Sequence, residues 1–228
     1  MAERPIFVPG AHRRYVDEIM LDFDWSPGFA PIQKQKNIRK LHAAAKEAGY
    51  FPILEVSTKS ENPLGVQLSA FNLRLNLFDR LVPLESVFQG SKVFEEGGPF
   101  EDLYLVSPRE ARSDERVRNS GSLIGFSIAD SHFPTRPRTC FYDWLYISAL
   151  YPRRDELGAL DDFAGFSDIE FNPERSINCQ ARSCALFVAL RRRGLLDSAA
   201  LSFDAFFDIS KEIAFHSQFH GSQRVPLA

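Results

Sequence analysis

Phenylalanine constrains the fold of this chain more than any other residue type. The sequence holds 21 Phe against 6 Tyr and 2 Trp, within an overall hydrophobic content of 44%. Because a Phe ring buries a large apolar surface, most of these rings should form an aromatic-packed core, which leaves a few to stack on a flat ligand. A chain of 228 residues with this content suffices for one large domain. Disorder as the main state of the chain is excluded.

Two hydrophobic periodicities run through the chain, and together they predict an α+β fold. Apolar residues recur at helical spacing in several segments and alternate with polar residues in others, most clearly from Phe71 to Leu77. The predicted helices cover residues 32–48, 84–95, 141–151, 155–160, 176–193 and 201–219, and the predicted extended segments cover residues 52–57, 71–77 and 166–171. We therefore expect a compact, mainly helical α+β fold with a small β-sheet.

Residues 1–60 differ in residue pattern from the rest of the chain. We therefore expect an N-terminal extension packed on a domain of residues 61–228. The predicted helix of this extension carries four cations, Lys34, Lys36, Arg39 and Lys40. They would either contact nucleic-acid phosphates, which makes binding sensitive to salt, or form a solvated helix face. The sequence leaves both alternatives open.

Charge and composition narrow the location and the ligand classes. Since no apolar run reaches the ~18 residues of a membrane span and the first residues lack a signal-peptide core, we expect a cytoplasmic protein without a membrane partner. The net charge of -3 argues against a general nucleic-acid coat but allows a local basic groove. Three Cys and five His without metal-ligand spacing predict neither a metal site nor a disulfide framework. No cofactor is expected.

The segment from Leu84 to Phe94 is the most informative one for chemistry. If it is helical, Glu85, Gln89 and Lys92 fall on one narrow stripe, and Glu96 would continue it. Such a stripe is either a solvated helix side or the polar wall of a pocket. Gly90 costs a helix interior about 1 kcal/mol relative to Ala, so a close approach at this position would explain it.

Two further segments carry polar groups that suit a nucleotide. Asp168 and Glu170 would face the same way in an extended segment, where paired carboxylates orient a ribose or act as acid and base. The alternative is a turn cluster before Pro173. A helix that starts near Ser176 would present free N–H groups and Arg182 to a phosphate, or would simply be a capped helix.

These segments resemble, in order and approximate spacing, the motifs of the NADAR family, whose name refers to NAD and ADP-ribose. The family helix motif reads Glu-x-x-Phe-Gln-x-x-Lys-Phe. Glu85, Phe88, Gln89 and Lys92 match it, and Val93 replaces the final Phe. The resemblance covers about residues 64–194 and implies the family's compact, mostly helical α+β fold.

The other three motifs are matched in part, which marks a divergent member. They read Phe-Ser-Asn-Phe, Asp-x-x-Trp-Gly and Asn-x-x-Gly-Lys in the family. The residues here are Ser69 and Phe71 of the first, Asp168 of the second, and Asn178 with Arg182 in place of Lys of the third. Asn72 would substitute for the missing Asn of the first motif. Asn172 and Ala181 stand where the family has Gly, which implies a shifted backbone contact with the ligand.

The resemblance implies an N-glycosidase that removes ADP-ribose from a modified nucleobase, with guanine in DNA as the expected base. Family members often act as antitoxins beside DNA ADP-ribosyltransferase toxins, so the expected partners are ADP-ribosylated nucleic acid or nucleoside and such a toxin. Other members cleave riboflavin-pathway intermediates, and that substrate is one alternative. A non-catalytic module that binds ADP-ribose or nucleic acid is another, and a structural protein with a surface stripe is a third.

The resemblance also implies roles for individual side chains. Lys92 would be the nucleophile that forms a Schiff base with the opened sugar, which requires a neutral amine. Glu85 would instead hold Lys92 charged if the two formed an ion pair, and the sequence leaves this conflict open. Asp168 or Glu85 would move protons. The expected substrate-binding residues are Ser69, Phe71, Asn72, Phe88, Gln89, Trp144, Glu170, Asn178 and Arg182, with Phe71, Phe88 or Trp144 stacking on a base.

Overall fold

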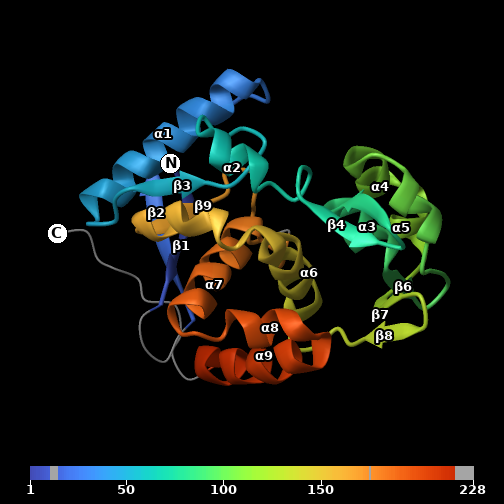
Figure 1. Cartoon of the computed structure of the whole chain (residues 1–228). Coiled ribbons are helices and arrows are strands. Elements are labelled where there is room, and N and C mark those ends of the chain that lie inside the picture. The colour runs from blue at the N-terminus through green and yellow to red at the C-terminus, as the bar shows by residue number, and fades with distance from the viewer. Residues whose placement is uncertain (11–14, 175, 219–228) are drawn as a thin grey trace.

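A four-stranded sheet built largely from the first 60 residues forms one end of the molecule (Figure 1). The structure, a computed structural model, describes residues 1–10, 15–174 and 176–218. The strands are β1 (Ala2–Pro9), β2 (Val16–Phe23), β3 (Ile53–Glu55) and β9 (Gly165–Ser167), in the order β2-β1-β9-β3. β1 runs antiparallel to β2 and β9, whereas β3 and β9 are parallel.

β1 and β2 have no counterpart among the predicted elements. Helices cover both faces of the sheet, so the successive residues Ile6 and Phe7 of β1 are both buried, each in a different core. A strand buried on both faces lacks the alternation that reveals a half-exposed one. The division of the chain at residue 60 stays a prediction.

Helices α1 (Pro31–Glu47) and α7 (Gln180–Arg192) supply those two cores. α1 packs Ile38, Leu41 and Ala45 against the sheet. These three residues belong to the apolar stripe of the helix predicted for residues 32–48. α7 packs on the other core, in which nearly all its apolar side chains are buried. The predicted start of this helix at residue 176 is wrong, because the helix begins at Gln180 after Cys179.

α6 (Cys140–Leu150), α8 (Leu196–Leu201) and α9 (Phe203–Gln218) complete the helical layer around α7 (Figure 1). The helix predicted for residues 201–219 corresponds to α9, which begins two residues later because Ser202 has an extended backbone after α8. Residue 219 lies outside the described residues. Short 3₁₀ segments occupy Tyr151–Arg153 and Glu156–Asp162, where a short helix was expected over residues 155–160.

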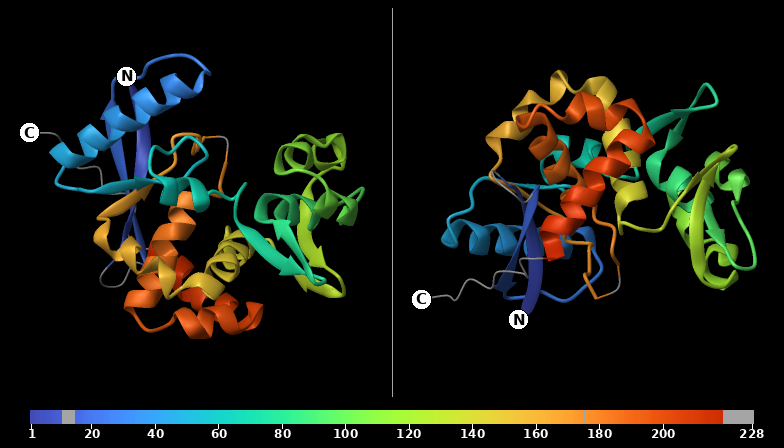
Figure 2. Two further views of the ribbon diagram at one scale, coloured as in Figure 1. Left: turned by 45° about the horizontal axis from the view of Figure 1, so that its top comes forward. Right: turned by 90° about the horizontal axis from the view of Figure 1, so that it is seen from below.

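The middle of the chain forms a second lobe beside α6, which Figure 1 and both views of Figure 2 separate from the sheet. α2 (Pro63–Gln67) leads into it. Its strands are β4 (Arg74–Leu77) and β5 (Arg80–Pro83), which form a hairpin, and β6 (Lys92–Phe94), β7 (Leu123–Ile128) and β8 (Ser131–Phe133), which form an antiparallel sheet. Its helical segments are α3 (Leu84–Gly90), the 3₁₀ segment Glu101–Leu105, α4 (Pro108–Ser113) and α5 (Glu115–Asn119).

α3 is shorter than the helix predicted for residues 84–95. It ends at Gly90, and Lys92–Phe94 instead forms strand β6, in which Lys92 pairs with Phe126 of β7. Glu96 is exposed in the following turn and does not extend the polar stripe. The periodicity of residues 84–92 is helical, but hydrogen bonds to a distant strand decide where the helix stops.

Gly90 packs against the 3₁₀ segment that follows β6. A Cβ atom at this position would lie 2.6 Å from Cε1 of Tyr104 and 2.9 Å from the carbonyl oxygen of Phe100. We expect Gly90→Ala to lower the free energy of unfolding by about 1–3 kcal/mol through overpacking, although Ala is the better helix former. Urea unfolding checks this. Gly158→Ala, where nothing lies within 4 Å, is the control and should leave the stability unchanged.

Aromatic packing joins the second lobe to α6. The ring of Phe141 in α6 stacks on Phe126 of β7 at 4.4 Å and lies 4.9 Å from Phe133 of β8. Phe88 of α3 contacts the same group, with its ring 5.0 Å from Tyr142. The aromatic-packed core expected from the Phe content is therefore present, and the predicted α+β class is confirmed. Within the described part of the chain, no helix has the length and apolar character needed to cross a membrane.

Candidate active site

Three polar side chains of the predicted stripe form a hydrogen-bonded row at the end of α3. The Gln89 amide nitrogen donates to Oε1 of Glu85 at 2.9 Å, and Lys92 Nζ donates to the Gln89 amide oxygen at 2.7 Å. Glu85 and Gln89 are buried, and Lys92 is half-buried. The row is thus no solvated helix face. Because α3 is followed directly by β6, Lys92 reaches Gln89 from the strand instead of from the helix.

Burial governs the charge state of Lys92. Desolvation lowers the pKa of Lys92 to about 8, with a smaller lowering from Arg112, while Glu85 opposes the shift. The Lys92 ammonium lies 4.8 Å from the centre of the Phe88 ring. Gln89 separates Lys92 from Glu85, so the lysine keeps the lowered pKa of a buried amine. Burial therefore favours the neutral amine of Lys92, and the charge of Glu85 favours the ammonium form.

The turn after α2 anchors the start of α3. The Glu85 N–H donates to the carbonyl oxygen of Ala70 at 3.2 Å. Ser69 is buried, and its Oγ accepts from the Phe71 N–H at 3.3 Å. Asn72 is exposed and donates its amide to the Val66 carbonyl oxygen. The strand predicted from Phe71 begins only at Arg74, because residues 70–72 form this turn.

Asp168 is connected to this turn through Gln180, the first residue of α7. The Gln180 amide nitrogen donates to Oδ2 of Asp168 at 3.0 Å, and its amide oxygen accepts from the Ala70 N–H at 2.8 Å. A chain of hydrogen bonds therefore joins Asp168, Gln180, Ala70 and Glu85. Burial, reinforced by the negative charge of Glu55, raises the pKa of Asp168 to about 8. Burial therefore favours the protonated form of Asp168.

Glu55 is a buried carboxyl group that belongs to none of the motifs. It accepts from Ser57 Oγ at 2.7 Å, from Ser167 Oγ at 2.6 Å and from the Ile169 N–H at 2.9 Å. His42 in turn hydrogen-bonds Ser167 Oγ at 2.8 Å. This network holds the end of β9 beside β3 and thereby positions Asp168. The sequence signal for Glu55 is a charged residue inside the apolar run from Ile53 to Val56.

The expectation that Asp168 and Glu170 face the same way is wrong. Residues 168–171 form a turn in which the Phe171 N–H donates to the Asp168 carbonyl oxygen at 3.1 Å. Glu170 therefore points to α1, where its carboxylate pairs with Lys34 at 3.1 Å. Only its backbone N–H contacts Asp168, at 3.0 Å from Oδ1. The turn therefore directs the side chains of Asp168 and Glu170 apart, whereas an extended backbone would have placed them on one face.

Tyr142 lies among the chemically active groups although no motif pointed to it. It is buried, its ring contacts Phe88, and burial together with Glu85 and Asp168 raises the pKa of its hydroxyl well above the usual value. Phe88, Tyr142 and Asn178 line a cavity of about 90 Å³. Asn178 of the last family motif therefore lies at the same cavity as Phe88 of the α3 motif. A tyrosine in a helix as aromatic as α6 carries no distinguishing signal in the sequence.

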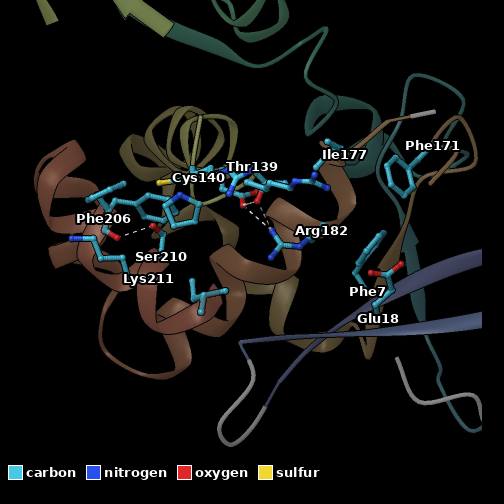
Figure 3. Close-up of a pocket in the computed structure, with 16 residues that line it drawn as sticks. Phe7, Glu18, Thr139, Cys140, Phe171, Ile177, Arg182, Phe206, Ser210 and Lys211 are labelled. Carbon is cyan, nitrogen blue, oxygen red and sulfur yellow. Dashed lines mark hydrogen bonds and ion pairs between the residues drawn. The ribbon is translucent and has the colours of Figure 1, made fainter. Parts of the chain in front are cut away.

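Arg182 lies apart from the row, in a larger cavity of about 780 Å³ (Figure 3). There it pairs with the buried carboxylate of Asp143 at 2.7 Å. Trp144 lies elsewhere in the core, with its ring 5.4 Å from Phe203 and 5.5 Å from Phe133. The structure therefore brings Glu85, Gln89 and Lys92 together, with Phe88 beside Lys92. Asn178 shares the small cavity with Phe88, and Asp168 is linked to the start of α3 through Gln180 and Ala70. Asn72, Trp144 and Glu170 lie at other contacts.

Other candidate groups are engaged in ordinary contacts. Of the four α1 cations, Lys34 pairs with Glu170, Arg39 with Glu61 and Lys40 with Asp24, so three of them are neutralised. The three cysteines are buried and free. In the part of the chain that the structure describes, no three His, Cys, Asp or Glu side chains gather where they would hold a metal ion.

Comparison with known proteins identifies the family. No curated protein matches the sequence. The family model of the DarT1-associated NADAR antitoxins matches residues 2–219, which extends the similarity well beyond the motifs of residues 64–194 on both sides. The chain therefore belongs to the NADAR-DarT1 family, the DarT1-associated NADAR antitoxins.

Proposed function

We propose that this protein is an N-glycosidase that removes ADP-ribose from a modified nucleobase, with guanine in DNA as the expected base. The observation that carries the proposal is the hydrogen-bonded row of Glu85, Gln89 and Lys92, which Ala70 and Gln180 connect to Asp168. It combines an amine whose pKa is lowered to about 8 by burial with a carboxyl group whose pKa burial raises. A nucleophile and a general acid of matched pKa are what cleavage of a sugar–base bond requires.

The chemistry follows from these two charge states. As the C–N bond to the base breaks, the electron pair leaves with the base, which takes a proton from Asp168. The sugar then has oxocarbenium character, which the Glu85 carboxylate stabilises. Neutral Lys92 adds to the sugar carbon and loses a proton, and ring opening gives a Schiff base. Water hydrolyses that imine, which releases ADP-ribose and restores the amine.

Gln89 has a defined part in this arrangement. Only one orientation of its amide satisfies both neighbours, with the nitrogen toward Glu85 and the oxygen toward Lys92. The amide thereby holds the lysine at a fixed position without supplying a negative charge. Phe88 and Tyr142 border the adjoining small cavity, where a sugar or base would enter. Asn178 lines the same cavity and offers hydrogen bonds to the substrate.

Incubation with an oligonucleotide that carries ADP-ribosylated guanine tests the proposal. The expected result is release of free ADP-ribose and recovery of the unmodified oligonucleotide. Chromatography and mass spectrometry detect both products. Binding of the modified strand without release would instead establish a binding module. We further propose that the enzyme counteracts a DarT1-type DNA ADP-ribosyltransferase, and co-expression should then protect cells only while the glycosidase is active.

A further inference from the structure

We propose that the large cavity around Arg182 is a separate phosphate-binding subsite that holds the phosphate groups of the substrate while the α3 row cleaves the sugar–base bond. The inference rests on the proposed function and extends it from Arg182 to Arg136 and Arg138, which no motif assigned. The cavity lies between the sheet and the helices α6, α7 and α9, and its volume of about 780 Å³ is within the usual range for ligand sites. Phosphate-bearing nucleotide ligands are the chemical class that its lining fits.

Positive charge dominates the lining. Arg136, Arg138, Arg182 and Lys211 border the cavity, against the two carboxylates of Glu18 and Asp143. Arg136 and Arg138 are exposed and have no hydrogen-bond or ion-pair partner among the described residues. Two unpaired guanidinium groups at the mouth of a cavity suit a phosphate, which they can bind through paired hydrogen bonds. Arg182 pairs with Asp143 and Lys211 with Asp208, so the unpaired positive charge of the lining comes from Arg136 and Arg138.

Arg182 is held in place at the floor of this cavity. Its Nη1 donates to Asp143 Oδ2 at 2.7 Å and to Thr139 Oγ1 at 3.3 Å. Asp143 is buried and is also bonded by Ser183. Within the described chain, Nε and Nη2 of Arg182 have no bond of their own, so the other edge of the guanidinium stays available. A guanidinium fixed on one edge loses little entropy when the other edge binds an anion.

The backbone at this position is strained in a way that suits a binding site. Thr139, which precedes α6 and lines both cavities, has a φ of 67°, a left-handed conformation that a β-branched residue adopts only under constraint. Its hydroxyl bonds Asp143 Oδ2 at 2.7 Å, which supplies part of that constraint. Such strain is often retained at ligand sites.

Aromatic and apolar side chains complete the walls. Figure 3 shows Arg182 between two groups of side chains, Phe7 and Phe171 on one side and Phe206 and Lys211 on the other. Lys211 lies over the Phe207 ring at 4.3 Å. Rings beside cations form the usual surface for a nucleotide, because the cations meet the phosphates and the rings meet the base or sugar.

The subsite is contiguous with the candidate active site. The large cavity and the small one lined by Phe88, Tyr142 and Asn178 share the wall formed by residues 137–140 and Ile177. A substrate whose sugar reaches the α3 row through the small cavity therefore extends its phosphates toward Arg182. Two sources have this chemistry, namely the diphosphate of the ADP-ribose itself and the phosphodiesters of the strand that carries it.

Binding measurements with a charge-reversed mouth test the proposal. The variant R136E/R138E is compared with R109E/R118E, which makes the same change of charge at exposed, unpaired arginines of α4 and α5. The probes are ADP-ribose, titrated by calorimetry, and an unmodified single-stranded DNA oligonucleotide, followed by fluorescence anisotropy at several salt concentrations. We expect R136E/R138E to weaken one of them about tenfold or more, and the control to leave both nearly unchanged.

The two arms separate the sources of phosphate. Loss of ADP-ribose affinity alone assigns the subsite to the diphosphate. Loss of DNA affinity assigns it to the strand. In that case the slope of log K against log salt concentration should become shallower by about 0.7 for each lost phosphate contact. If both affinities match those of the control variant, or if the wild type binds neither probe, the subsite does not exist. Neither probe is cleaved, so these binding measurements are independent of catalysis. If R136E/R138E weakens binding but the wild type releases no ADP-ribose from modified DNA, only the proposed glycosidase activity is contradicted. If the wild type releases ADP-ribose but R136E/R138E binds both probes as the control does, only the subsite is contradicted.

Discussion

Replacing Lys92 by alanine is expected to lower the release of ADP-ribose by about 10³-fold or more, the scale of loss seen when a nucleophile is removed. The physical reason is that no other amine faces Gln89 and Glu85 in the described structure, so nothing replaces the Schiff base. Borohydride added during turnover should trap a covalent adduct on the wild-type protein at Lys92. The same treatment should leave the variant unlabelled in mass spectrometry.

Two controls make the result specific. Lys92→Arg keeps a cation over the Phe88 ring but cannot form an imine, so it should be as inactive as Lys92→Ala. Lys36→Ala, an exposed lysine of α1, should keep full activity. Equal melting temperatures of the three proteins would show that folding is not the cause. Full activity of Lys92→Ala would rule out the Schiff-base mechanism.

Replacing Asp168 by asparagine is expected to lower kcat/KM by about 10² to 10⁴-fold, the usual contribution of a general acid. In the wild type, kcat/KM should rise with pH as Lys92 loses its proton and fall as Asp168 loses its own. Since burial brings the pKa of each group to about 8, the profile should be a bell with its maximum near pH 8. Asp168→Asn should lose the alkaline fall and keep the acid limb.

Glu170→Gln is the matched control for this experiment. It removes a carboxylate that pairs with Lys34 and makes only the smallest of the contributions that raise the pKa of Asp168, so it should leave the rate nearly unchanged and move the alkaline limb only slightly to lower pH. An unchanged alkaline limb in Asp168→Asn would show that another group supplies the proton. Glu85 would then be the remaining candidate.

Local elements were predictable because their signals are local. α1 begins and ends within one residue of the predicted segment, since its apolar stripe and Gly49 need no distant partner. The row of Glu85, Gln89 and Lys92 was also predictable, because side chains three and four positions apart meet on one side of a helical turn. Its buried state was not predictable, since the same spacing occurs on solvated helices.

The errors of prediction that matter for the site involve distant contacts. Lys92 belongs to a strand because β7, about thirty residues later, pairs with it. Asp168 and Glu170 diverge because the network around Glu55 holds the chain in a turn after β9. Tyr142 and Gln180 carry no signal of their own, and only packing against α3 and against Asp168 places them in the site.

The α+β class, the family resemblance and the three side chains of the polar row could be predicted from the amino-acid sequence, because periodicity and spacing act over a few residues. The tertiary structure decided the burial that lowers the pKa of Lys92 and raises that of Asp168. It also decided the cavity in which Arg182 lies. Desolvation depends on what other segments place around a group, and so it appears only when the chain has folded.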